Sequence, residues 1–173
     1  KKLKPSWRNE FEIVDALQLL LEERNNISYN TITKFWKDTG TPDDIIHANK
    51  IILDNIQIKN LWTQEKNVDI SGKISLGKNS IIKDNCKIMG PVIIGENCIL
   101  ENNCKIGPNV SIGNNCKIAN SQIENSIIMD NCIIDSEIFV ENSIIANNCQ
   151  IRSEKEKLEK KKFLLGEGTK INF

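Results

Sequence analysis

Histidine, aromatic side chains and net charge are all scarce in this chain of 173 residues. It has one His, aromatic residues make up 5% of it, and 23 basic residues balance 23 acidic ones. A chain with no excess of positive charge lacks the basic surface that nucleic-acid binding usually needs. No apolar run approaches the roughly 20 residues of a membrane-spanning helix, and no segment has the pattern of a signal peptide. We therefore expect a cytoplasmic protein that binds neither nucleic acid nor membrane.

A repeat of six residues runs from Val68 to Ile118. An amphipathic helix has an apolar period of 3.6 and a strand a period of 2, so a period of six fits neither. A fixed hexad predicts a β-solenoid in which each repeat supplies one short strand and one turn. Three hexads would make one triangular coil, and this arrangement resembles the left-handed parallel β-helix. The repeated aliphatic residues are Ile70, Leu76, Ile82, Ile88, Ile94, Leu100, Ile106, Ile112 and Ile118.

Residues 18 apart are expected to stack in such a coil, separated by one inter-strand spacing of ~4.8 Å. The stacking predicts three inward aliphatic columns, which are Ile70, Ile88 and Ile106; Leu76, Ile94 and Ile112; and Ile82, Leu100 and Ile118. Asparagine recurs three residues after the aliphatic position, and it tolerates the left-handed backbone conformation of a tight corner. These asparagines are Asn79, Asn85, Asn97, Asn103, Asn109 and Asn115.

The six cysteines do not have the spacing of a metal site. No Cys-x-x-Cys occurs, and the single histidine, His47, lies outside the repeats. The cysteines of the regular hexads occupy the inward position two residues before the aliphatic one, where a thiol acts as a small apolar group. Cys86 is expected to stack on Cys104 and Cys98 on Cys116. A reducing cytosol would leave them as free thiols.

The hexad rhythm becomes irregular after Ile118. We interpret residues 119–152 as the same solenoid with shortened or bulged corners, and the highly charged residues 153–162 as a loop or a short solvated helix. Residues 163–173 return to the pattern as a terminal strand. The aliphatic positions expected to continue the columns are Ile123, Ile128, Ile134, Ile138, Ile145, Ile151, Leu165 and Ile171.

Residues 1–60 differ from the repeats. A helix is expected to begin between Asn9 and Asp15 and to end near Arg24, because apolar residues recur there at helical spacing. Alternating apolar residues over 27–35 predict a half-buried strand. Thr41 is expected to be the N-cap of a second helix, with Pro42 at its first position. The expected buried side of this helix is Ile45, Ile46, Ile52 and Leu53.

One strand and two helices cannot close a hydrophobic core. Trp7, Phe11, Phe35 and Trp36 would need a partner surface. We therefore interpret residues 1–60 as the remnant of an α/β domain and residues 61–173 as a β-helix domain, which makes the chain mostly β. Trp62 is expected to anchor the two domains to each other.

Two segments resemble a known enzyme family. Residues 4–16 have the sequence KPSWRNEFEIVDA and look like the end of a sugar nucleotidyltransferase domain. Residues 36–44 have the sequence WKDTGTPDD, continued by Ala48-Asn49, and are the more specific match. With a C-terminal β-helix, they resemble the C-terminal part of the long form of glucose-1-phosphate thymidylyltransferase.

The resemblance implies transfer of a nucleotidyl group from dTTP to glucose 1-phosphate, with release of pyrophosphate and a need for Mg²⁺. In that family the Asp of the Trp-x-Asp-Thr-Gly motif is one of two carboxylates that hold the metal, and Asp38 stands at that position. Spacing alone favours a turn residue before Thr39-Gly40 for Asp38, and it is the motif that favours the metal role. The family's Gly-rich nucleotide loop, its first metal carboxylate and its phosphate-binding basic residues have no counterpart here. We therefore assign no catalytic residue and expect the chain alone to be inactive.

Three alternatives stay open. β-Helices of this kind often belong to acyl-CoA-dependent acyltransferases, but those use a His base on the β-helix, and no His lies between Val68 and Phe173. The β-helix could instead serve assembly or regulation, or be a purely structural trimerisation module; a homo-oligomer is expected, with a trimer favoured. Related enzymes also use mannose 1-phosphate with GTP, or N-acetylglucosamine 1-phosphate with UTP.

Overall fold

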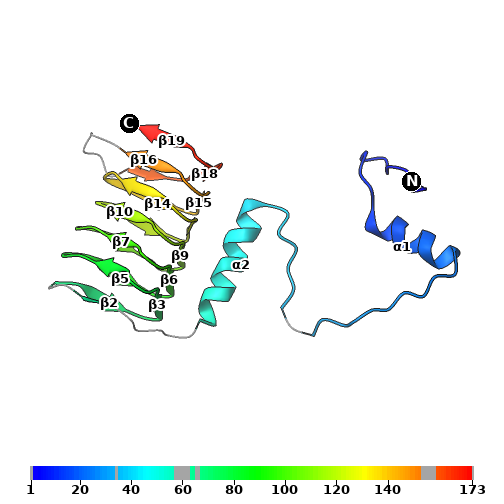
Figure 1. The fold of residues 1–173 in the computed structure, drawn as a ribbon, viewed down its shortest axis with the longest axis horizontal. Helices are drawn as coiled ribbons and strands as arrows, with labels where there is room; N and C mark the ends of the chain where they lie inside the picture. The colour runs from blue at the N-terminus through cyan, green and yellow to red at the C-terminus, as the bar shows by residue number, and fades with distance from the viewer. Residues whose placement is uncertain (1, 34, 57–62, 65–66, 153–158, 173) are drawn as a thin grey trace. The chain divides into compact units, whose positions relative to one another are not determined.

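A computed structural model describes residues 2–33, 35–56, 63–64, 67–152 and 159–172. The chain divides into two compact units, Lys1–Trp36 and Lys37–Phe173, shown as a ribbon in Figure 1. The boundary expected at residue 60, and with it Trp62, lies outside the described residues. The second helix, which we grouped with residues 1–60, belongs to the same compact unit as the solenoid.

The first unit contains helix α1, Ile13–Glu22, and its existence and limits agree with the prediction. Its N-cap, Glu12, makes no side-chain capping hydrogen bond. Glu12 instead accepts a hydrogen bond from Arg8, 2.7 Å between Oε1 and Nη2, and this bond lowers the pKa of the Glu12 carboxyl. α1 has no buried residue.

The strand predicted over residues 27–35 is wrong. The described residues of this segment have no regular structure, and Ile27, Tyr29 and Phe35 are exposed. A strand needs hydrogen-bonded neighbours for its backbone groups. The described part of the first unit has no second strand to supply them, so alternation alone does not produce one.

Helix α2, Pro42–Asp54, confirms the predicted start. Thr41 Oγ1 accepts a hydrogen bond from Asp44 N, and Asp44 Oδ2 accepts one from Thr41 N, both at 3.2 Å. This capping box satisfies two backbone donors that the first turn leaves unpaired. Leu53 is buried and Ile46 half-buried as predicted, but Ile45 and Ile52 are 39% and 62% exposed. The prediction for these two was wrong because α2 lies against the solenoid along a narrower stripe than the four residues span.

The second unit is a parallel β-solenoid built from three sheets, which we number 1 to 3. Sheet 1 contains β2 (Asp69–Ser71), β5 (Lys87–Met89), β8 (Lys105–Ile106), β11 (Gln122–Glu124), β14 (Ile138–Glu141) and β17 (Glu159–Lys161). Sheet 2 contains β3 (Ile74–Leu76), β6 (Val92–Ile94), β9 (Val110–Ile112), β12 (Ile127–Ile128), β15 (Ile144–Ile145) and β18 (Leu164–Leu165). Sheet 3 contains β1 (Thr63–Gln64), β4 (Ile81–Ile82), β7 (Ile99–Leu100), β10 (Lys117–Ala119), β13 (Ile133–Asp135), β16 (Gln150–Arg152) and β19 (Lys170–Asn172).

The strand register confirms the three aliphatic columns of the regular hexads. Ile88 pairs with Ile70 and Ile106, and the other two columns pair in the same way. After Ile118 the columns continue through shorter coils, with Ile118 opposite Ile134 and Ile134 opposite Ile151. Each coil therefore buries its inward side chains on the next, which is the source of the core.

Of three predictions about the residues after Ile118, two were wrong and one is confirmed. Val140, and not Ile138, continues the column of sheet 1 opposite Ile123; Ile138 is also buried, at the position two residues earlier. Residues 159–161 are neither loop nor helix but form β17, which pairs with β14; residues 153–158 lie outside the described residues. The return to the pattern after residue 163 is confirmed, because Leu165 pairs with Ile145 and Ile171 with Ile151.

The corner asparagines have the backbone conformation expected of them. The six in the regular hexads have φ angles between 56° and 62°, in the left-handed region. Later corners use the same residue, at Asn120, Asn125, Asn131, Asn142 and Asn148. Asparagine thus supplies a tight corner repeatedly without needing glycine.

All six cysteines are buried and free. Cys86 lies next to Cys104 and Cys98 next to Cys116 in adjacent coils, as predicted. Each thiol donates to a carbonyl oxygen of the following coil at 2.9–3.3 Å. Hydrogen bonds to neighbouring thiols, together with burial, raise the pKa of Cys104 and Cys116 above the usual range of a thiol. The thiols therefore join successive coils as well as filling space.

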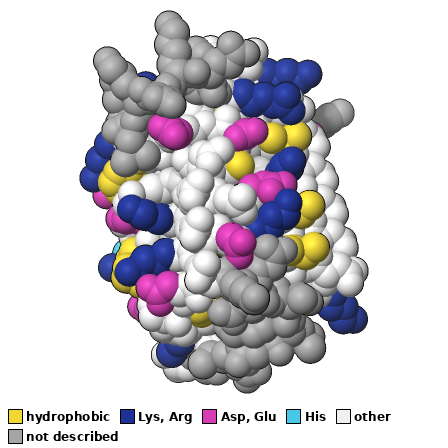
Figure 2. Space-filling view, turned by 90° about the vertical axis from the view of Figure 1, so that its left-hand side faces the viewer, with side chains coloured by type: hydrophobic (Ala, Val, Ile, Leu, Met, Phe, Trp, Pro, Cys, Tyr) yellow, Lys and Arg dark blue, Asp and Glu magenta, His cyan; other side chains and the backbone are white. Residues whose placement is uncertain are grey.

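The surface of the solenoid carries charges of both signs. Figure 2 shows acidic and basic side chains interspersed on one side of the molecule, with scattered hydrophobic ones. Glu101 illustrates the pattern, since Lys83 and Lys117 from the neighbouring coils lie 2.6 and 3.3 Å from its carboxylate and lower its pKa. None of the described helices is long and apolar enough to cross a membrane.

Candidate functional site

Asp38 lies in an extended segment immediately before α2. Its side chain is exposed, and in the described part of the chain it forms no hydrogen bond or ion pair. The preceding residue, Lys37, is held more firmly: its Nζ lies 2.9 Å from Asp44 Oδ1 and 3.0 Å from His47 Nδ1. The backbone next to Asp38 is therefore tied to the first turns of α2.

The first turn of α2 concentrates negative charge at the positive end of the helix dipole. Asp43 and Asp44 both lie there, which is the favourable end for a carboxylate. The hydrogen bond from Thr41, with that from Lys37, lowers the pKa of Asp44 to about 2. Asp44 is thus ionised throughout the neutral range and holds both Thr41 and Lys37.

Three polar contacts fix α2 to the solenoid at successive heights. Lys73 Nζ donates to the Asp54 carbonyl oxygen at 2.6 Å, near the first coil. Ser111 Oγ in β9 donates to Asn49 Oδ1 at 2.6 Å, in the middle of the helix. Lys162 Nζ lies 2.9 Å from Asp43 Oδ1, at the last coil. The helix therefore runs along the stack beside β3, β6 and β9, as Figure 1 shows.

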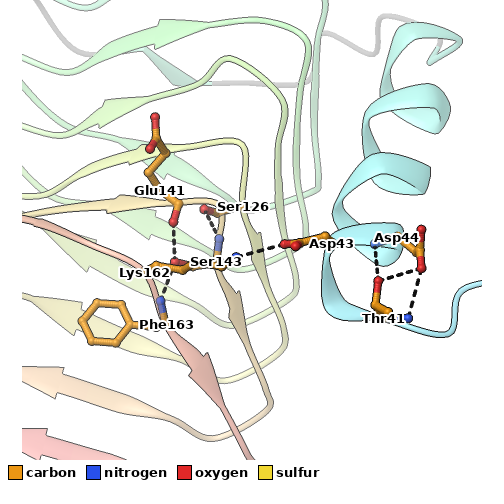
Figure 3. Close-up of polar contacts among 8 residues, drawn as sticks. All are labelled: Thr41, Asp43, Asp44, Ser126, Glu141, Ser143, Lys162 and Phe163. Atoms are coloured by element: carbon orange, nitrogen blue, oxygen red, sulfur yellow. Dashed lines mark hydrogen bonds and ion pairs between the residues drawn. The ribbon is translucent and has the colours of Figure 1, made fainter.

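Two buried serines, Ser126 and Ser143, position the segment that carries Lys162, as Figure 3 shows. Ser126 Oγ accepts from Ser143 N at 3.1 Å, and Ser143 Oγ accepts from Phe163 N at 2.7 Å. Phe163 is buried, so Lys162 before it is held at the rim of the solenoid, where it reaches Asp43. The contact thus joins the end of the solenoid to the beginning of α2.

A groove of about 390 Å³ lies between α2 and one corner of the solenoid. One wall is a stripe of α2 residues at helical spacing, and the other is a column of corner asparagines. The lining residues are Asp43, Ile46, His47, Lys50, Asn109, Asn125 and Asn142. Sequence reasoning did not find this groove, because only the docking of α2 brings its two walls together.

Asp38 is a suitable but incomplete magnesium ligand. An exposed, unpaired carboxylate is the hard oxygen donor that Mg²⁺ prefers, and Mg²⁺ is often held by one or two carboxylates together with substrate phosphates. Among the described residues, no three His, Cys, Asp or Glu side chains come together as a ligand set. The chain therefore fits the role of supplying one ligand.

Two family models match the chain. Residues 1–55 match the Nucleotidyl transferase model, and residues 88–172 match the GMPPB C-terminal domain model. The first match contains α1, Asp38 and α2, and the second covers most of the solenoid. The chain thus joins a segment similar to nucleotidyl transferases to a β-solenoid, and the predicted resemblance to sugar nucleotidyltransferases is confirmed.

Individual relatives agree with the family models. The chain is 39% identical over 80 residues to the low-salt glycan biosynthesis nucleotidyltransferase Agl11 of Haloferax volcanii, an alignment of 46% of this chain and 22% of that protein. It is 31% identical over 85 residues to the glucose-1-phosphate thymidylyltransferase of Streptomyces antibioticus, covering 49% and 24%. It is 41% identical over 81 residues to the bifunctional protein GlmU of Methanococcus aeolicus, covering 47% and 16%. The chain therefore spans about a fifth of the length of these relatives.

Proposed function

We propose that this chain is the C-terminal part of an enzyme that makes dTDP-glucose and pyrophosphate from dTTP and glucose 1-phosphate. The observation that carries the proposal is the position of the motif around Asp38, directly before the capped helix α2 and inside the segment that matches the Nucleotidyl transferase model. Two relatives named glucose-1-phosphate thymidylyltransferase support the choice of substrates.

In this proposal Asp38 holds one side of a Mg²⁺ ion. The metal, when bound, neutralises the charge of the nucleoside triphosphate and of the departing pyrophosphate. The protein's contribution is positioning. Lys37 is held by Asp44 and His47, and Thr41 by the capping box, so the residues on both sides of Asp38 are fixed.

The test is pyrophosphate release by the full-length gene product, measured with several nucleoside triphosphates and sugar 1-phosphates. We expect the highest rate with dTTP and glucose 1-phosphate, and a fall of roughly 10²–10³-fold in kcat for Asp38→Asn, the effect of removing one well-placed electrostatic group. Asp54→Asn is the control, because its exposed carboxylate lies at the other end of α2. Equal rates for wild type and Asp38→Asn would refute the metal role. Higher activity with another pair would reassign the substrates.

We further propose that the 173-residue chain alone is inactive, because it has no counterpart of the family's nucleotide-binding loop. Pyrophosphate release from dTTP by the purified chain would contradict this. The comparison with the full-length protein separates a missing domain from a wrong choice of substrates.

We propose that the solenoid serves assembly or regulation, and that it forms a homo-oligomer, with a trimer favoured. On sheet 3, Ile81 is 40% exposed and pairs with the partly exposed Ile99 of the next coil. Ile133 is also partly exposed and lies two coils beyond Ile99, with Lys117 between them. Light scattering is expected to give the mass of a trimer for the wild type and a lower mass for Ile81→Glu. Lys87→Glu, on sheet 1, is the control. A wild-type mass that stays monomeric at all concentrations would refute assembly through the solenoid.

An acyltransferase is the second candidate, because relatives include a bifunctional sugar-1-phosphate nucleotidylyltransferase/acetyltransferase of Sulfurisphaera tokodaii, 35% identical over 83 residues. The only histidine, His47, lies on α2, and its Nδ1 accepts from Lys37. A chain that uses no histidine of its solenoid would need another general base. Release of free thiol from acetyl-CoA by the full-length protein in the presence of an amino-sugar 1-phosphate would favour this candidate.

A further inference from the structure

We propose that the groove between α2 and the corner asparagines binds a small molecule that carries a phosphate group. This inference does not depend on nucleotidyl transfer. The volume of about 390 Å³ lies at the lower end of the range for small-ligand sites. The contents of its two walls indicate the chemistry of the ligand.

The asparagine wall has unused hydrogen-bond donors. Asn109 Nδ2 donates to Asn125 Oδ1 at 2.9 Å, which occupies the acceptor of Asn125 and leaves its NH₂ group without a partner among the described residues. The side chain of Asn142, one coil further, has no hydrogen-bond partner in the same part of the chain. Two amide groups one coil apart therefore offer N–H groups along this wall.

The helical wall adds two further donors. An ammonium group can only donate, so Lys37 Nζ at 3.0 Å makes His47 Nδ1 an acceptor and leaves the ring proton on Nε2. Lys50 is one turn further along the same face, and it has no partner in the described part of the chain. His47 and Lys50 thus face the same groove as Asn125 and Asn142.

The charge of the groove favours an anion. Among the residues that the structure describes, Asp43 is the one carboxylate lining the groove and pairs with Lys162 at 2.9 Å, whereas no acidic group pairs with Lys50. Four donor groups from two walls suit the three terminal oxygens of a phosphate monoester, which accept more hydrogen bonds and carry more negative charge than the two oxygens of a carboxylate. The geometry therefore points to a phosphate monoester, with the rest of the molecule lying along the groove.

The experiment is an NMR titration of the ¹⁵N-labelled 173-residue chain, at constant ionic strength, with inorganic phosphate and with glucose 1-phosphate. We expect saturable shifts of the side-chain amides of Asn125 and Asn142 and of the His47 ring. Stronger binding of glucose 1-phosphate would identify an organic phosphate as the ligand, and equal binding would identify free phosphate. No saturable shift up to about 10 mM of either probe, tenfold above a Kd of 1 mM, would overturn the proposal.

Two variants and one control localise the binding. Lys50→Gln removes the uncompensated charge, and Asn142→Gly removes an amide while it keeps a residue that tolerates the left-handed backbone. Each is expected to weaken binding at least tenfold. Lys78→Gln, at an exposed position on another corner, should bind like the wild type. Shifts that are equally lost in all three variants, or that appear on dilution and concentration without any probe, would overturn the proposal and indicate non-specific attraction or contact with a second copy.

Discussion

The first compact unit and the β-solenoid treat their apolar side chains in opposite ways. In the first unit Trp7 is 94% exposed and Ile13 73%, whereas Ile88, Leu100 and Ile118 in the solenoid are 0% exposed. The apolar face of α1 needs a surface from elsewhere, but each coil of the solenoid covers the coil before it. Repetition therefore lets a chain with few aromatic residues build a core from its nearest neighbours, and a single amphipathic helix cannot do this alone.

The largest expected effect comes from deleting the same kind of side chain in the two regions. Ile118→Ala should lower the free energy of unfolding of the solenoid by about 2–5 kcal/mol, because it leaves a cavity between coils. Leu17→Ala, on the half-exposed face of α1, should change it by less than ~0.5 kcal/mol. Urea unfolding followed by circular dichroism measures both. Similar losses would show that α1 contributes to the same cooperative unit.

Glycine substitutions test whether tight stacking of the coils is the reason that the solenoid, unlike the first compact unit, has a buried core. Gly107 has a φ of +101°, and a Cβ there would overlap the Met89 carbonyl oxygen of the preceding coil. Gly107→Ala should therefore lower the free energy of unfolding by at least ~2 kcal/mol. Gly166→Ala is the control, since nothing lies within 4 Å of its added Cβ. A neutral Gly107→Ala in the same urea measurement would mean that the coils can move apart.

Substitution of a buried cysteine is expected to have a smaller effect on the free energy of unfolding. Cys132 Sγ donates to the Ala146 carbonyl oxygen at 3.1 Å, and Ser80 makes the same kind of bond to Gly95 at 2.7 Å. Cys132→Ser keeps the donor and should cost less than Cys132→Ala, which is expected to lower the free energy of unfolding by ~1–3 kcal/mol because the carbonyl loses its partner. A larger loss of unfolding free energy for Cys132→Ser than for Cys132→Ala would show that these thiols act only by filling space.

The smallest effect concerns the caps of the two helices. α2 has a capping box and α1 has no side-chain cap. The pKa of Asp44 falls from 3.8 to about 2 on folding. The stabilisation of α2 by the Asp44 carboxylate is therefore fully present above pH 3.8 and is lost as the pH falls to about 2. NMR shifts of the α2 amides should report this loss of helix between pH 5 and pH 2, whereas Asp44→Asn should remove the pH dependence. An unchanged titration in that variant would assign it to another group.

Features that follow from local or repeated sequence could be predicted. The columns around Ile88, the corner at Asn97 and the cap at Thr41 each depend on a short pattern whose physical cause is contained in it. The predictions that failed depend on partners far away in the chain. Alternation over residues 27–35 does not say whether a neighbouring strand exists, and the four apolar residues of α2 do not say how wide a surface receives them.

In the candidate site, too, the residue that depends on a local motif was predicted, and the residues that depend on distant partners were not. Asp38 was found from its motif, and its metal role stays a prediction. The groove was missed, because nothing near His47 or Lys50 in the sequence indicates Asn125 and Asn142. Lys162 was also missed, because it lies in a highly charged segment that we expected to be solvated. The signal beside it was Phe163, an apolar residue that is buried in the core of the solenoid.

The length of α2 has a consequence for how this protein can change in evolution. A helix of 13 residues is about 20 Å long, somewhat shorter than the five coil spacings of ~4.8 Å that separate β3 from β18. Its two ends are held by Lys73 at the first coil and Lys162 at the last, while Asn49 is held in between. Gain or loss of a coil after Ser111 would move Lys162 away from Asp43 by ~4.8 Å. The number of coils is thus matched to the length of α2. A lineage could add a repeat only by also lengthening the helix or by losing the Lys162–Asp43 contact.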